Sequence, residues 1–338
     1  MRRAFSLLAV GITIALTAAQ PVLTLTFIKA AGVAALIFCL GGLTERVGKG
    51  PETSQLFKLS PSHKDPAKHM LAYERLMASV TFPQLYPACG HITHPELPMD
   101  MTVARQSMSK SQDGEDVHLY DMLFKDDKEP GVFLEIGALD GEQFSNSYFY
   151  EHALGWKGIL VEANPENAAK LRKAPRPRSA IFTLAVCGID EGFQNPGSLT
   201  FSKAGGAVAT AVDHAAPGFL DTWKDSLGAE RVVVPCMPLQ LLIDASGLWD
   251  IDFFSLDVEG GERFVLETVD LHKTNIRAIM IEQDGWNKEK DEWIRNHLMS
   301  HGFQKVETNF ENPHGNEIFV NPRFNEIKAS RPPLPIQC

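Results

Sequence analysis

Short, unbroken apolar runs alternate with helix-like segments through most of the chain between residues 131 and 320. Apolar runs that lack a polar face are typical of strands buried on both sides in a parallel sheet, with helices covering it. We expect strands at 132–136, 158–161, 180–186, 252–256 and 276–281, and helices at 145–154, 165–173, 262–269 and 288–301. Residues 303–308 and 317–320 have the pattern of a hairpin. The sequence therefore predicts an α/β fold whose mostly parallel sheet has an antiparallel edge.

The length of 338 residues leaves room for one large α/β domain once the N-terminal residues are set aside. We predict four parts: an apolar signal or anchor region at 1–43, a proline-rich stem or linker at 44–108, the domain at 109–322 and a tail at 323–338. Glycine-broken β pieces at 198–212 predict a hairpin insertion. The wider insertion at about 190–230 is expected to shape the pocket of the substrate.

Residues 1–43 contain two apolar stretches separated by Gln20 and Pro21. In one interpretation, residues 1–19 are a cleavable signal peptide. In the other, which we favour, the region is a retained membrane anchor, because residues 22–43 supply the roughly 20 residues that a spanning helix needs. Basic residues flank this stretch on both sides, so the charge pattern does not decide its orientation.

The amino-acid composition disfavours nucleic acid as a partner and a fold that depends on a disulfide framework. A formal net charge of −10 argues against nucleic acid as the main partner, because phosphate binding requires a basic surface. The five cysteines are too few and too scattered for a disulfide framework. Cys187 and Cys236 lie in apolar runs, where buried free thiols are common, and we expect both to be free thiols.

Acidic residues stand at the ends of neighbouring predicted strands. Glu135 and Asp140 belong to the stretch GVFLEIGALDG, which contains the first strand, whereas Glu162 ends the second strand and Asp257 the fourth. Ligands of an open parallel sheet bind beyond the carboxyl ends of the strands, so these acids are candidate ligand contacts. Gly137 lacks a side chain, which lets the backbone turn sharply and approach a ligand there.

The positions of these acids favour one class of cofactor. An acid at the end of the second strand is the group that accepts hydrogen bonds from the ribose hydroxyls of an adenosine, which assigns that contact to Glu162. Acids in the first loop would repel a pyrophosphate but suit a positively charged ligand. Together the two features point to S-adenosylmethionine, which carries a sulfonium. A nicotinamide-dependent enzyme is the competing interpretation, and the absence of a G-x-G-x-x-G loop disfavours it.

Three motifs resemble the FkbM family of methyltransferases: FLEIGALDGEQFSNS (133–147), ILVEANP (159–165) and IDFFSLDVEGGE (251–262). The resemblance covers about residues 105–322. The first motif, together with the N-terminal apolar segment, is most similar to the eukaryotic branch that includes the membrane protein Star. The resemblance implies a Rossmann-like class I methyltransferase fold with a seven-stranded sheet, and S-adenosylmethionine as cofactor. For the Star-like branch it also implies a membrane-tethered role in the secretory pathway.

Carried over onto this sequence, the family's cofactor-binding positions are nine residues near the ends of the first three strands. They are Glu135, Gly137, Ala138, Asp140 and Gly141 for the methionine part, Glu162 and Ala163 for the ribose, and Ala185 and Val186 beside the adenine.

Three further acids are candidate catalytic residues. Asp257 and Glu259 lie two residues apart on an extended segment, so their side chains face the same side. One could accept a proton from a substrate hydroxyl while the other orients it. Alternatively, Asp257 anchors the amino group of the cofactor. Glu282 ends the next strand, where it either joins the same rim or pairs with Arg277 or Lys288.

The leading hypothesis is a membrane-tethered, S-adenosylmethionine-dependent O-methyltransferase that acts on a hydroxyl or carboxyl of a glycan, lipid or small metabolite. Transfer from a sulfonium relies on positioning and desolvation, and no metal site is expected because no tight cluster of Asp, Asn and His stands out. The alternative is a non-catalytic trafficking or scaffold protein that keeps the fold, as the Star-like branch allows. We expect a single-pass membrane protein of the ER or Golgi, with its sidedness left open.

Overall fold

The computed structural model describes residues 80–81, 100–188, 197–283, 285–308 and 315–331. The strands are β1 (Val80–Thr81), β2 (Val132–Ile136), β3 (Lys157–Val161), β4 (Ser179–Phe182), β5 (Ala185–Val186), β6 (Ser198–Ser202), β7 (Arg231–Met237), β8 (Asp250–Leu256), β9 (Asn275–Glu282), β10 (Gln304–Val306) and β11 (Asn316–Val320). The α-helices are α4 (Met101–Met108), α5 (Glu115–Leu119), α6 (Tyr148–Leu154), α7 (Pro165–Leu171), α9 (Pro217–Leu227), α10 (Leu239–Ser246), α11 (Glu262–Leu266), α12 (Lys288–Ser300) and α13 (Phe324–Ser330), and a π-helical segment, η2 (Tyr120–Phe124), follows α5.

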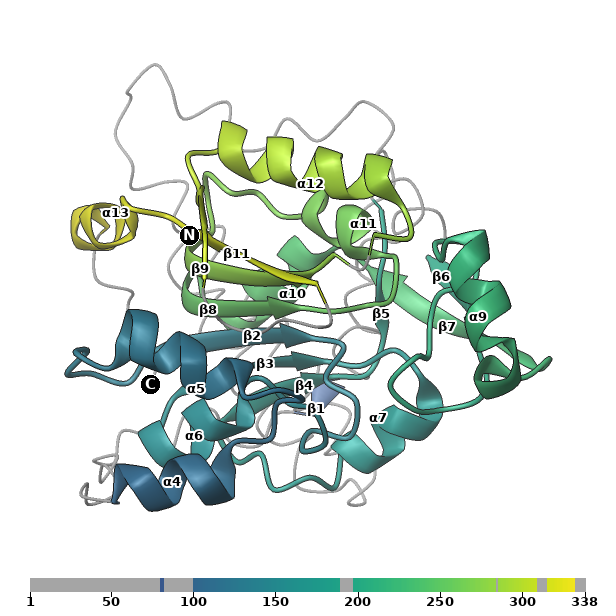
Figure 1. Ribbon diagram of the computed structural model, residues 1–338, viewed down its shortest axis with the longest axis horizontal. Coiled ribbons are helices and arrows are strands. Elements are labelled where there is room, and N and C mark those ends of the chain that lie inside the picture. Colours follow the sequence, from purple (N-terminus) through teal and green to yellow (C-terminus); the bar gives the residue numbers. More distant parts are fainter. Residues whose placement is uncertain (1–79, 82–99, 189–196, 284, 309–314, 332–338) are drawn as a thin grey trace, which may run out of the picture. The chain divides into compact units, whose positions relative to one another are not determined.

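The main sheet of this part of the chain has eight strands in the order β1-β4-β3-β2-β8-β9-β11-β10 (Figure 1). From β4 to β9 the strands are parallel, whereas β11 is antiparallel to β9 and β10 is antiparallel to β11. The two-residue β1 pairs antiparallel with β4 at the other edge. Without β1, this is the predicted mostly parallel sheet of seven strands with an antiparallel edge hairpin. The predicted Rossmann-like α/β fold is therefore confirmed.

Helices cover both faces of the main sheet (Figure 1). On one face, Leu134, Ile159 and Phe254 pack with buried residues of α10, α11 and α12. On the other face, Phe133 and Leu160 pack with buried residues of α4, α5, α6 and α7. Burial on both sides is the reason why these strands lack the polar alternation of a half-exposed sheet.

The register of the main sheet places the carboxyl ends of its central strands level with one another. Ile136 pairs with Val161 on one side and with Leu256 on the other, and Leu256 pairs with Ile281. From β2 the chain adds β3 and β4 on one side of the sheet, and β8 and β9 on the other side. Ligands of such folds bind where this order reverses, which is between β2 and β8. The residues that come next at this edge are Gly137, Glu162, Asp257 and Glu282.

The predicted third strand, at 180–186, is divided between two sheets. β4 ends at Phe182, and two residues later the chain forms β5, which belongs to a three-stranded sheet of order β5-β7-β6. We predicted that β6 would pair within a hairpin at 198–212, but it pairs antiparallel with β7. Within the predicted hairpin, an isolated bridge joins Phe201 to Ala211. The helices α9 and α10 were not predicted.

Residues packed against the sheet also lie outside the predicted domain limits of 109 and 322. Ala104 of α4 is fully buried, although it belongs to the predicted stem. Phe324 of α13 is buried as well, and its carbonyl accepts a hydrogen bond from Asn275 Nδ2 at 3.1 Å, although it belongs to the predicted tail.

The predicted signal or anchor region at 1–43 lies outside the described residues. Within the described part of the chain, none of the helices combines the length and the apolar character that crossing a membrane requires.

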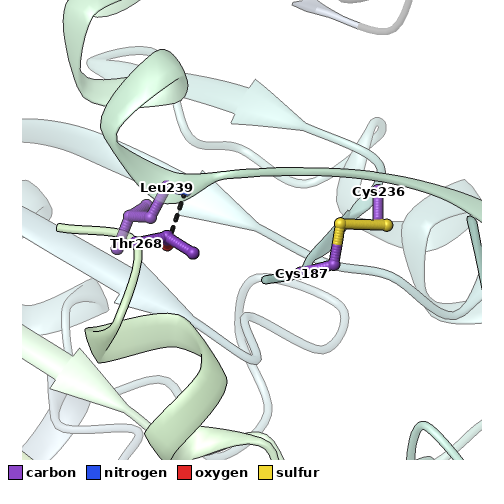
Figure 2. The surroundings of a disulfide bond; sticks show 4 residues. All are labelled: Cys187, Cys236, Leu239 and Thr268. Carbon is purple, nitrogen blue, oxygen red and sulfur yellow. Dashed lines mark hydrogen bonds between the residues drawn. A yellow bond between two sulfur atoms is a disulfide. The ribbon is translucent and has the colours of Figure 1, made fainter. Parts of the chain in front are cut away.

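Cys187 and Cys236 form a disulfide bond that joins the segment after β5 to β7 (Figure 2). Their prediction as free thiols was wrong. They are 49 residues apart in the sequence, and the parallel pairing of β5 with β7 brings their Cα atoms to 5.6 Å. Just beyond β7, the N–H of Leu239 donates to Thr268 Oγ1 at 2.9 Å (Figure 2). The position of β5 beside β7 is thus fixed covalently.

Candidate functional site

A cavity lies where the strands of the main sheet end, and we call it the strand-end cavity. Its lining includes Gly137, Glu162, Ala163, Ala185 and Val186, five of the nine predicted cofactor-binding residues. It also includes two of the candidate catalytic acids, Asp257 and Glu259. The structure thus gathers residues from the ends of β2, β3 and β8, and from β5, around one space.

Glu162 is a buried carboxyl group in this cavity. Its Oε2 accepts a hydrogen bond from the N–H of Leu139 at 2.9 Å, and its Oε1 accepts one from the N–H of Asn164 at 2.7 Å. Burial raises the pKa of Glu162 to about 7, although the backbone hydrogen bonds oppose this shift. Near neutral pH the group therefore stands between its two protonation states, and hydroxyl donors in the cavity would favour the ionised one.

At Gly137 the loop after β2 lies close to the end of β8. It has a φ of +89°, and a Cβ at this position would lie 1.8 Å from the carbonyl oxygen of Asp257. The N–H groups of Gly137 and Ala138 both donate to the carbonyl of Val161 at 3.0 Å, so the loop lies between the ends of β3 and β8. The positive φ and the lack of room for a Cβ both require a glycine at this position.

Asn164 holds the insertion in place over the cavity. Its Oδ1 caps α7 by accepting a hydrogen bond from the N–H of Glu166 at 2.9 Å. Its Nδ2 donates to the carbonyls of Ser202 and Ala204, both at 3.0 Å. The insertion contributes Leu199, Phe201, Ala209, Ala211 and His214 to the lining of this cavity, and its role in shaping an acceptor pocket stays a prediction. The role of Asn164 was not predicted.

The three candidate catalytic acids meet at the edge of the strand-end cavity, as predicted. One oxygen from each of Asp257, Glu259 and Glu282 lies within 4.8 Å of the others, and we call this group the acid cluster. Burial, together with the negative charges of Asp257, Glu259 and Glu262, raises the pKa of Glu282 to about 12. The raised pKa favours the protonated form of Glu282 at neutral pH. Asp257 and Glu259 remain the candidates for the role of base, and all three catalytic assignments stay predictions.

The alternative pairing of Glu282 with Arg277 is not what the structure shows. Arg277 instead pairs with Asp127 and, at 4.0 Å, with Asp252. Among the described residues, the acid cluster is the one group of three acidic, His or Cys side chains close enough to share a metal ion. Carboxylate oxygens are ligands for Mg²⁺ and Ca²⁺. The expected lack of a metal site stays a prediction.

The turn after β8 holds Glu259 in a strained backbone conformation, with a φ of +56°. Thr210 Oγ1 donates to the carbonyl of Glu259 at 2.9 Å. The carboxylate of Glu262 accepts a hydrogen bond from the N–H of Gly260 at 3.0 Å and forms a buried ion pair with Lys290 of α12. Strained residues that their surroundings hold in this way cluster at functional sites.

Glu135 does not line the strand-end cavity, in contrast to its predicted contact with the methionine part of the cofactor. Side chains alternate along β2, so Glu135 lies on the same face as Phe133, whereas Ile136 lines the cavity. Its carboxylate accepts hydrogen bonds from Ser145 Oγ at 2.9 Å and from the N–H of Asn146 at 2.7 Å. Burial raises the pKa of Glu135 above its usual value.

Three other predicted cofactor-binding residues also lie outside the lining of the strand-end cavity and shape the loop instead. Ala138 is buried in the core, in a cluster that also contains Phe149 and Tyr150 of α6. Asp140 Oδ1 accepts hydrogen bonds from the N–H groups of Glu142 at 3.0 Å and Gln143 at 2.8 Å. Gly141 has a φ of +85°, and a Cβ there would lie 2.6 Å from a side chain of α7. These placements indicate a structural contribution to the loop.

A second, smaller hollow adjoins the strand-end cavity, and we call it the side hollow. Glu259 and His214 line both spaces. Phe219 of α9, Trp286 and Lys290 are also among the residues that line the side hollow. Aromatic side chains therefore stand next to the acid cluster.

The residues around the strand-end cavity fit the chemistry of S-adenosylmethionine. Glu162 offers a carboxylate to ribose hydroxyls, and Ala185, Val186 and Phe201 offer an apolar wall to an adenine ring. The acid cluster offers negative charge to a sulfonium and an amino group. The cofactor inferred from the sequence is thus compatible with the donor and charge pattern of the cavity.

Comparison with solved structures finds distant likenesses. The methyltransferase FkbM from Methylobacillus flagellatus KT is 12% identical, with 65% of this chain and 57% of that chain covered and a TM-score of 0.36. A precorrin-6y C5,15-methyltransferase from Geobacter metallireducens GS-15 is 13% identical, with 64% and 90% covered and a TM-score of 0.33. An O-methyltransferase from Bacillus cereus, in complex with SAH, is 9% identical, with 77% and 93% covered and a TM-score of 0.32. Likenesses this distant carry no argument about function.

No curated protein matches the sequence. Residues 135–305, just over half of the chain, match the methyltransferase FkbM domain family, and this match includes the ends of β2, β3, β8 and β9. The Star-like, eukaryotic branch stays a prediction. On the strength of the domain match, the chain belongs to the FkbM methyltransferase family.

Proposed function

We propose that the chain is an S-adenosylmethionine-dependent O-methyltransferase that methylates a hydroxyl group of a glycan, lipid or small metabolite. One arrangement carries the proposal: the buried carboxyl of Glu162 and the acids Asp257 and Glu259 line the same cavity at the strand ends. Membership of the FkbM methyltransferase family supports it.

Glu162 would hold the ribose by accepting hydrogen bonds from its two hydroxyls. The backbone N–H groups of Leu139 and Asn164 already donate to this carboxylate and hold it in place at the cavity. Ala185 and Val186 would flank the adenine. The acid cluster would then lie toward the positively charged methionine part, where its negative charge stabilises the bound cofactor.

S-adenosylmethionine supplies a methyl group on a positively charged sulfur, which becomes a neutral thioether when the methyl group leaves. The residues of the chain align the acceptor oxygen with the methyl–sulfur bond and exclude water. As the acceptor oxygen bonds to the methyl carbon, its proton passes to Asp257 or Glu259. Protonated Glu282 shares a hydrogen bond with Asp257, which orients that carboxylate and limits the negative charge of the cluster.

The side hollow is the proposed acceptor site, because it meets the strand-end cavity at Glu259 and His214. Trp286 and Phe219 offer flat apolar surfaces on which the ring of a sugar or a small metabolite can pack. An acceptor carboxylate would bring a further negative charge next to the acid cluster, which is unfavourable in a site with little water. The site therefore favours a hydroxyl acceptor over a carboxyl one.

Methyl transfer by the full-length chain tests this function. The chain is incubated with methyl-labelled S-adenosylmethionine and a panel of neutral glycosides, hydroxylated lipids and carboxylic acids, with and without EDTA. We expect label in hydroxyl compounds, and a loss of about 10²–10⁴-fold in kcat when Asp257→Asn or Glu259→Gln removes the base. Glu230→Gln, a surface control that removes a carboxylate paired with Lys203, should leave the rate unchanged.

Titration calorimetry with S-adenosylmethionine on the wild type and on Glu162→Ala addresses the non-catalytic alternative. A wild-type chain that binds no S-adenosylmethionine, and that behaves identically to Glu162→Ala, would contradict the enzyme proposal and favour a scaffold protein that keeps the fold.

We further propose that the domain works on the oxidising side of an ER or Golgi membrane, tethered through residues 1–43. The buried disulfide between Cys187 and Cys236 supports this side, because disulfides persist in the secretory pathway and are rare in the cytosol. Protease treatment of intact vesicles tests it. Protection of a C-terminal epitope is expected, and its digestion without detergent would contradict the proposal.

A further inference from the structure

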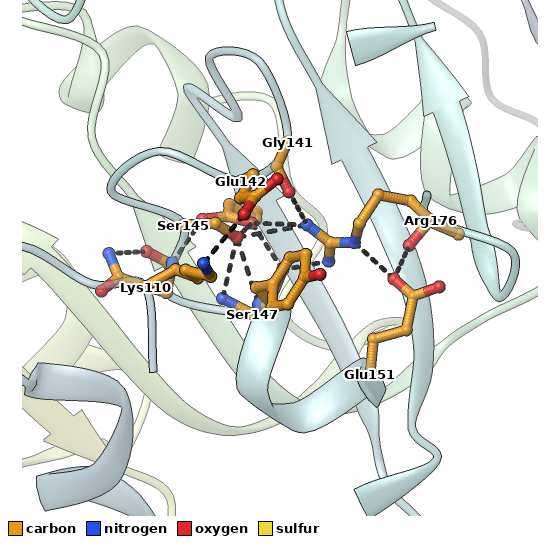
Figure 3. Close-up of polar contacts among 12 residues, drawn as sticks. Lys110, Gly141, Glu142, Ser145, Ser147, Glu151 and Arg176 are labelled. Atoms are coloured by element: carbon orange, nitrogen blue, oxygen red, sulfur yellow. Dashed lines mark hydrogen bonds and ion pairs between the residues drawn. The ribbon is translucent and has the colours of Figure 1, made fainter. Parts of the chain in front are cut away.

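Arg176, in the turn between α7 and β4, is a buried arginine with only 2% of its surface exposed. Its guanidinium makes four hydrogen bonds, drawn in Figure 3: Nε donates to Glu151 Oε2 at 2.6 Å, Nη1 to the Gly141 carbonyl at 2.8 Å and to Ser145 Oγ at 3.2 Å, and Nη2 to Ser147 Oγ at 2.7 Å. Because the guanidinium is planar and buried, its hydrogen bonds restrict the positions of the groups that accept them.

The contacts of Arg176 connect a helix to a loop. Glu151 belongs to α6 and also accepts hydrogen bonds from Ser179 Oγ and from the N–H of Arg178, both at 2.6 Å, so this side of the network is anchored in regular structure. The other three hydrogen bonds all reach the segment 137–147, which follows β2. Figure 3 shows Gly141, Ser145 and Ser147 gathered around the guanidinium, on the side away from Glu151.

The segment 137–147 needs such support, because its backbone is strained. Leu139 and Phe144 have φ values of +50° and +58°, a region that residues with a side chain rarely adopt. Conformations of this kind persist only when surrounding contacts determine them. The hydrogen bond that Arg176 makes to the Gly141 carbonyl lies between the two strained residues.

The conformation of this segment reaches the strand-end cavity through Leu139. The N–H of Leu139 donates to Glu162 Oε2 at 2.9 Å, on the carboxyl group that we propose holds the ribose. A shift of the segment would withdraw this donor and move Gly137, which lines the cavity. Arg176 itself lines neither the strand-end cavity nor the side hollow. Any influence on the cofactor therefore passes through the segment.

We propose that Arg176 is a positioning residue for the cofactor: it fixes the segment 137–147 so that the Leu139 N–H and Gly137 stay where a bound cofactor needs them. This inference rests on the proposed function. Lysine keeps the positive charge, yet it lacks the planar fork that reaches acceptors on several sides at once. Arg176→Lys therefore separates the geometry of the guanidinium from its charge.

Arg277 offers a matched control. Its guanidinium also donates to a carboxylate, that of Asp127, and to a carbonyl, that of Leu123, and it lies over the ring of Phe124. It belongs to the amino-terminal half of β9, at the end of the sheet away from the cavity. Arg277→Lys should lower stability without changing cofactor affinity.

Two measurements on the full-length chain test the proposal. Titration calorimetry with S-adenosylmethionine should show binding at least about tenfold weaker in Arg176→Lys and unchanged in Arg277→Lys. Hydrogen exchange in residues 137–147 should be faster in unliganded Arg176→Lys, and saturating cofactor should restore protection. The KM for the cofactor should rise while kcat stays within about twofold, since Arg176 contacts no reacting group.

Ser147→Ala provides a second, milder variant, which leaves Arg176 in place and removes one of its acceptors. It should weaken cofactor binding several-fold, and it decides the matter should Arg176→Lys fail to fold. Wild-type affinity and wild-type exchange in the variants that fold would overturn the positioning role. Lack of cofactor binding by the wild-type chain would instead contradict the proposed function, and the exchange measurement would still show whether Arg176 fixes the segment.

Discussion

The backbone N–H of Leu139 donates a hydrogen bond to the carboxyl group of Glu162 at 2.9 Å, which joins the loop after β2 to the end of β3. Leu139 is held at a φ of +50°, and burial raises the pKa of Glu162 to about 7. The charge on one strand end is thus coupled to the conformation of a loop from the neighbouring strand. A ligand that requires ionised Glu162 also benefits from the loop in this conformation.

Gly137→Ala should destabilise the chain more than an ordinary glycine substitution. The new Cβ would be strained by the φ of +89° and would also meet the carbonyl oxygen of Asp257. We expect a loss of about 2–5 kcal/mol in the free energy of unfolding, from backbone strain and overpacking together. Urea unfolding of the full-length chain measures it.

Gly302→Ala is the matched control for that substitution. Gly302 has the same φ of +89°, but a Cβ added there would meet no atom of the described residues within 4 Å. It should lose only the strain contribution of about 1–2 kcal/mol. Equal losses in the two variants would contradict the close packing of Gly137 against Asp257.

Glu282→Gln should make the chain more stable at alkaline pH. The pKa of Glu282 is about 12 in the folded chain, against an ordinary value of 4.5, so between these values the folded state binds more protons than the unfolded state. The stability that the protonated group contributes is complete below pH 4.5 and is lost progressively as the pH rises through the neutral range toward 12. Glutamine is neutral throughout and removes this dependence.

At pH 8 the Glu282→Gln variant should exceed the wild type by more than about 1 kcal/mol, or about 2–4 °C in Tm, and the difference should shrink toward pH 5. Thermal unfolding at several pH values measures this trend. A wild-type chain that is the more stable of the two at pH 8 would show that Glu282 is ionised or favourably paired.

Loss of the disulfide should destabilise the domain and weaken cofactor binding. The bond closes a loop of 49 residues, for which chain entropy predicts about 4 kcal/mol, and measured effects are typically about 2–4 kcal/mol. Binding should weaken because Ala185 and Val186, which line the cavity, directly precede Cys187. Reductant should lower the Tm of the wild type but not that of a Cys187→Ser/Cys236→Ser double variant. A wild-type Tm that is insensitive to reduction of this bond would contradict the prediction.

The meeting of Asp257 with Glu282 could be predicted from the sequence. Continuous apolar strands identify a parallel sheet, and acids that end adjacent parallel strands of that sheet come together at one edge. The side-chain direction of Glu135 could be predicted as well, but only by applying the alternation of side chains along β2. This alternation turns Glu135 to the face of Phe133, away from the cavity.

Contacts between distant segments could not be predicted in the same way. Arg176 reaches Gly141 because of the geometry of the turn after α7, and no periodic pattern in the sequence encodes that geometry. Cys187 meets Cys236 only because the chain leaves the main sheet after β4 and forms β5, and an apolar run gives no sign of that change.

The proposed function requires that Glu162 holds the cofactor through its ionised carboxylate. Titration calorimetry of S-adenosylmethionine against the full-length wild type and Glu162→Gln, at pH 6.0 and pH 7.5, measures this dependence. With a pKa of about 7, the ionised fraction of Glu162 rises about eightfold between these pH values, and wild-type affinity should rise by a similar factor. Glu162→Gln should bind more weakly at pH 7.5 and lack that rise. Equal affinities of the two proteins at both pH values would show that the ionised carboxylate of Glu162 does not hold the cofactor.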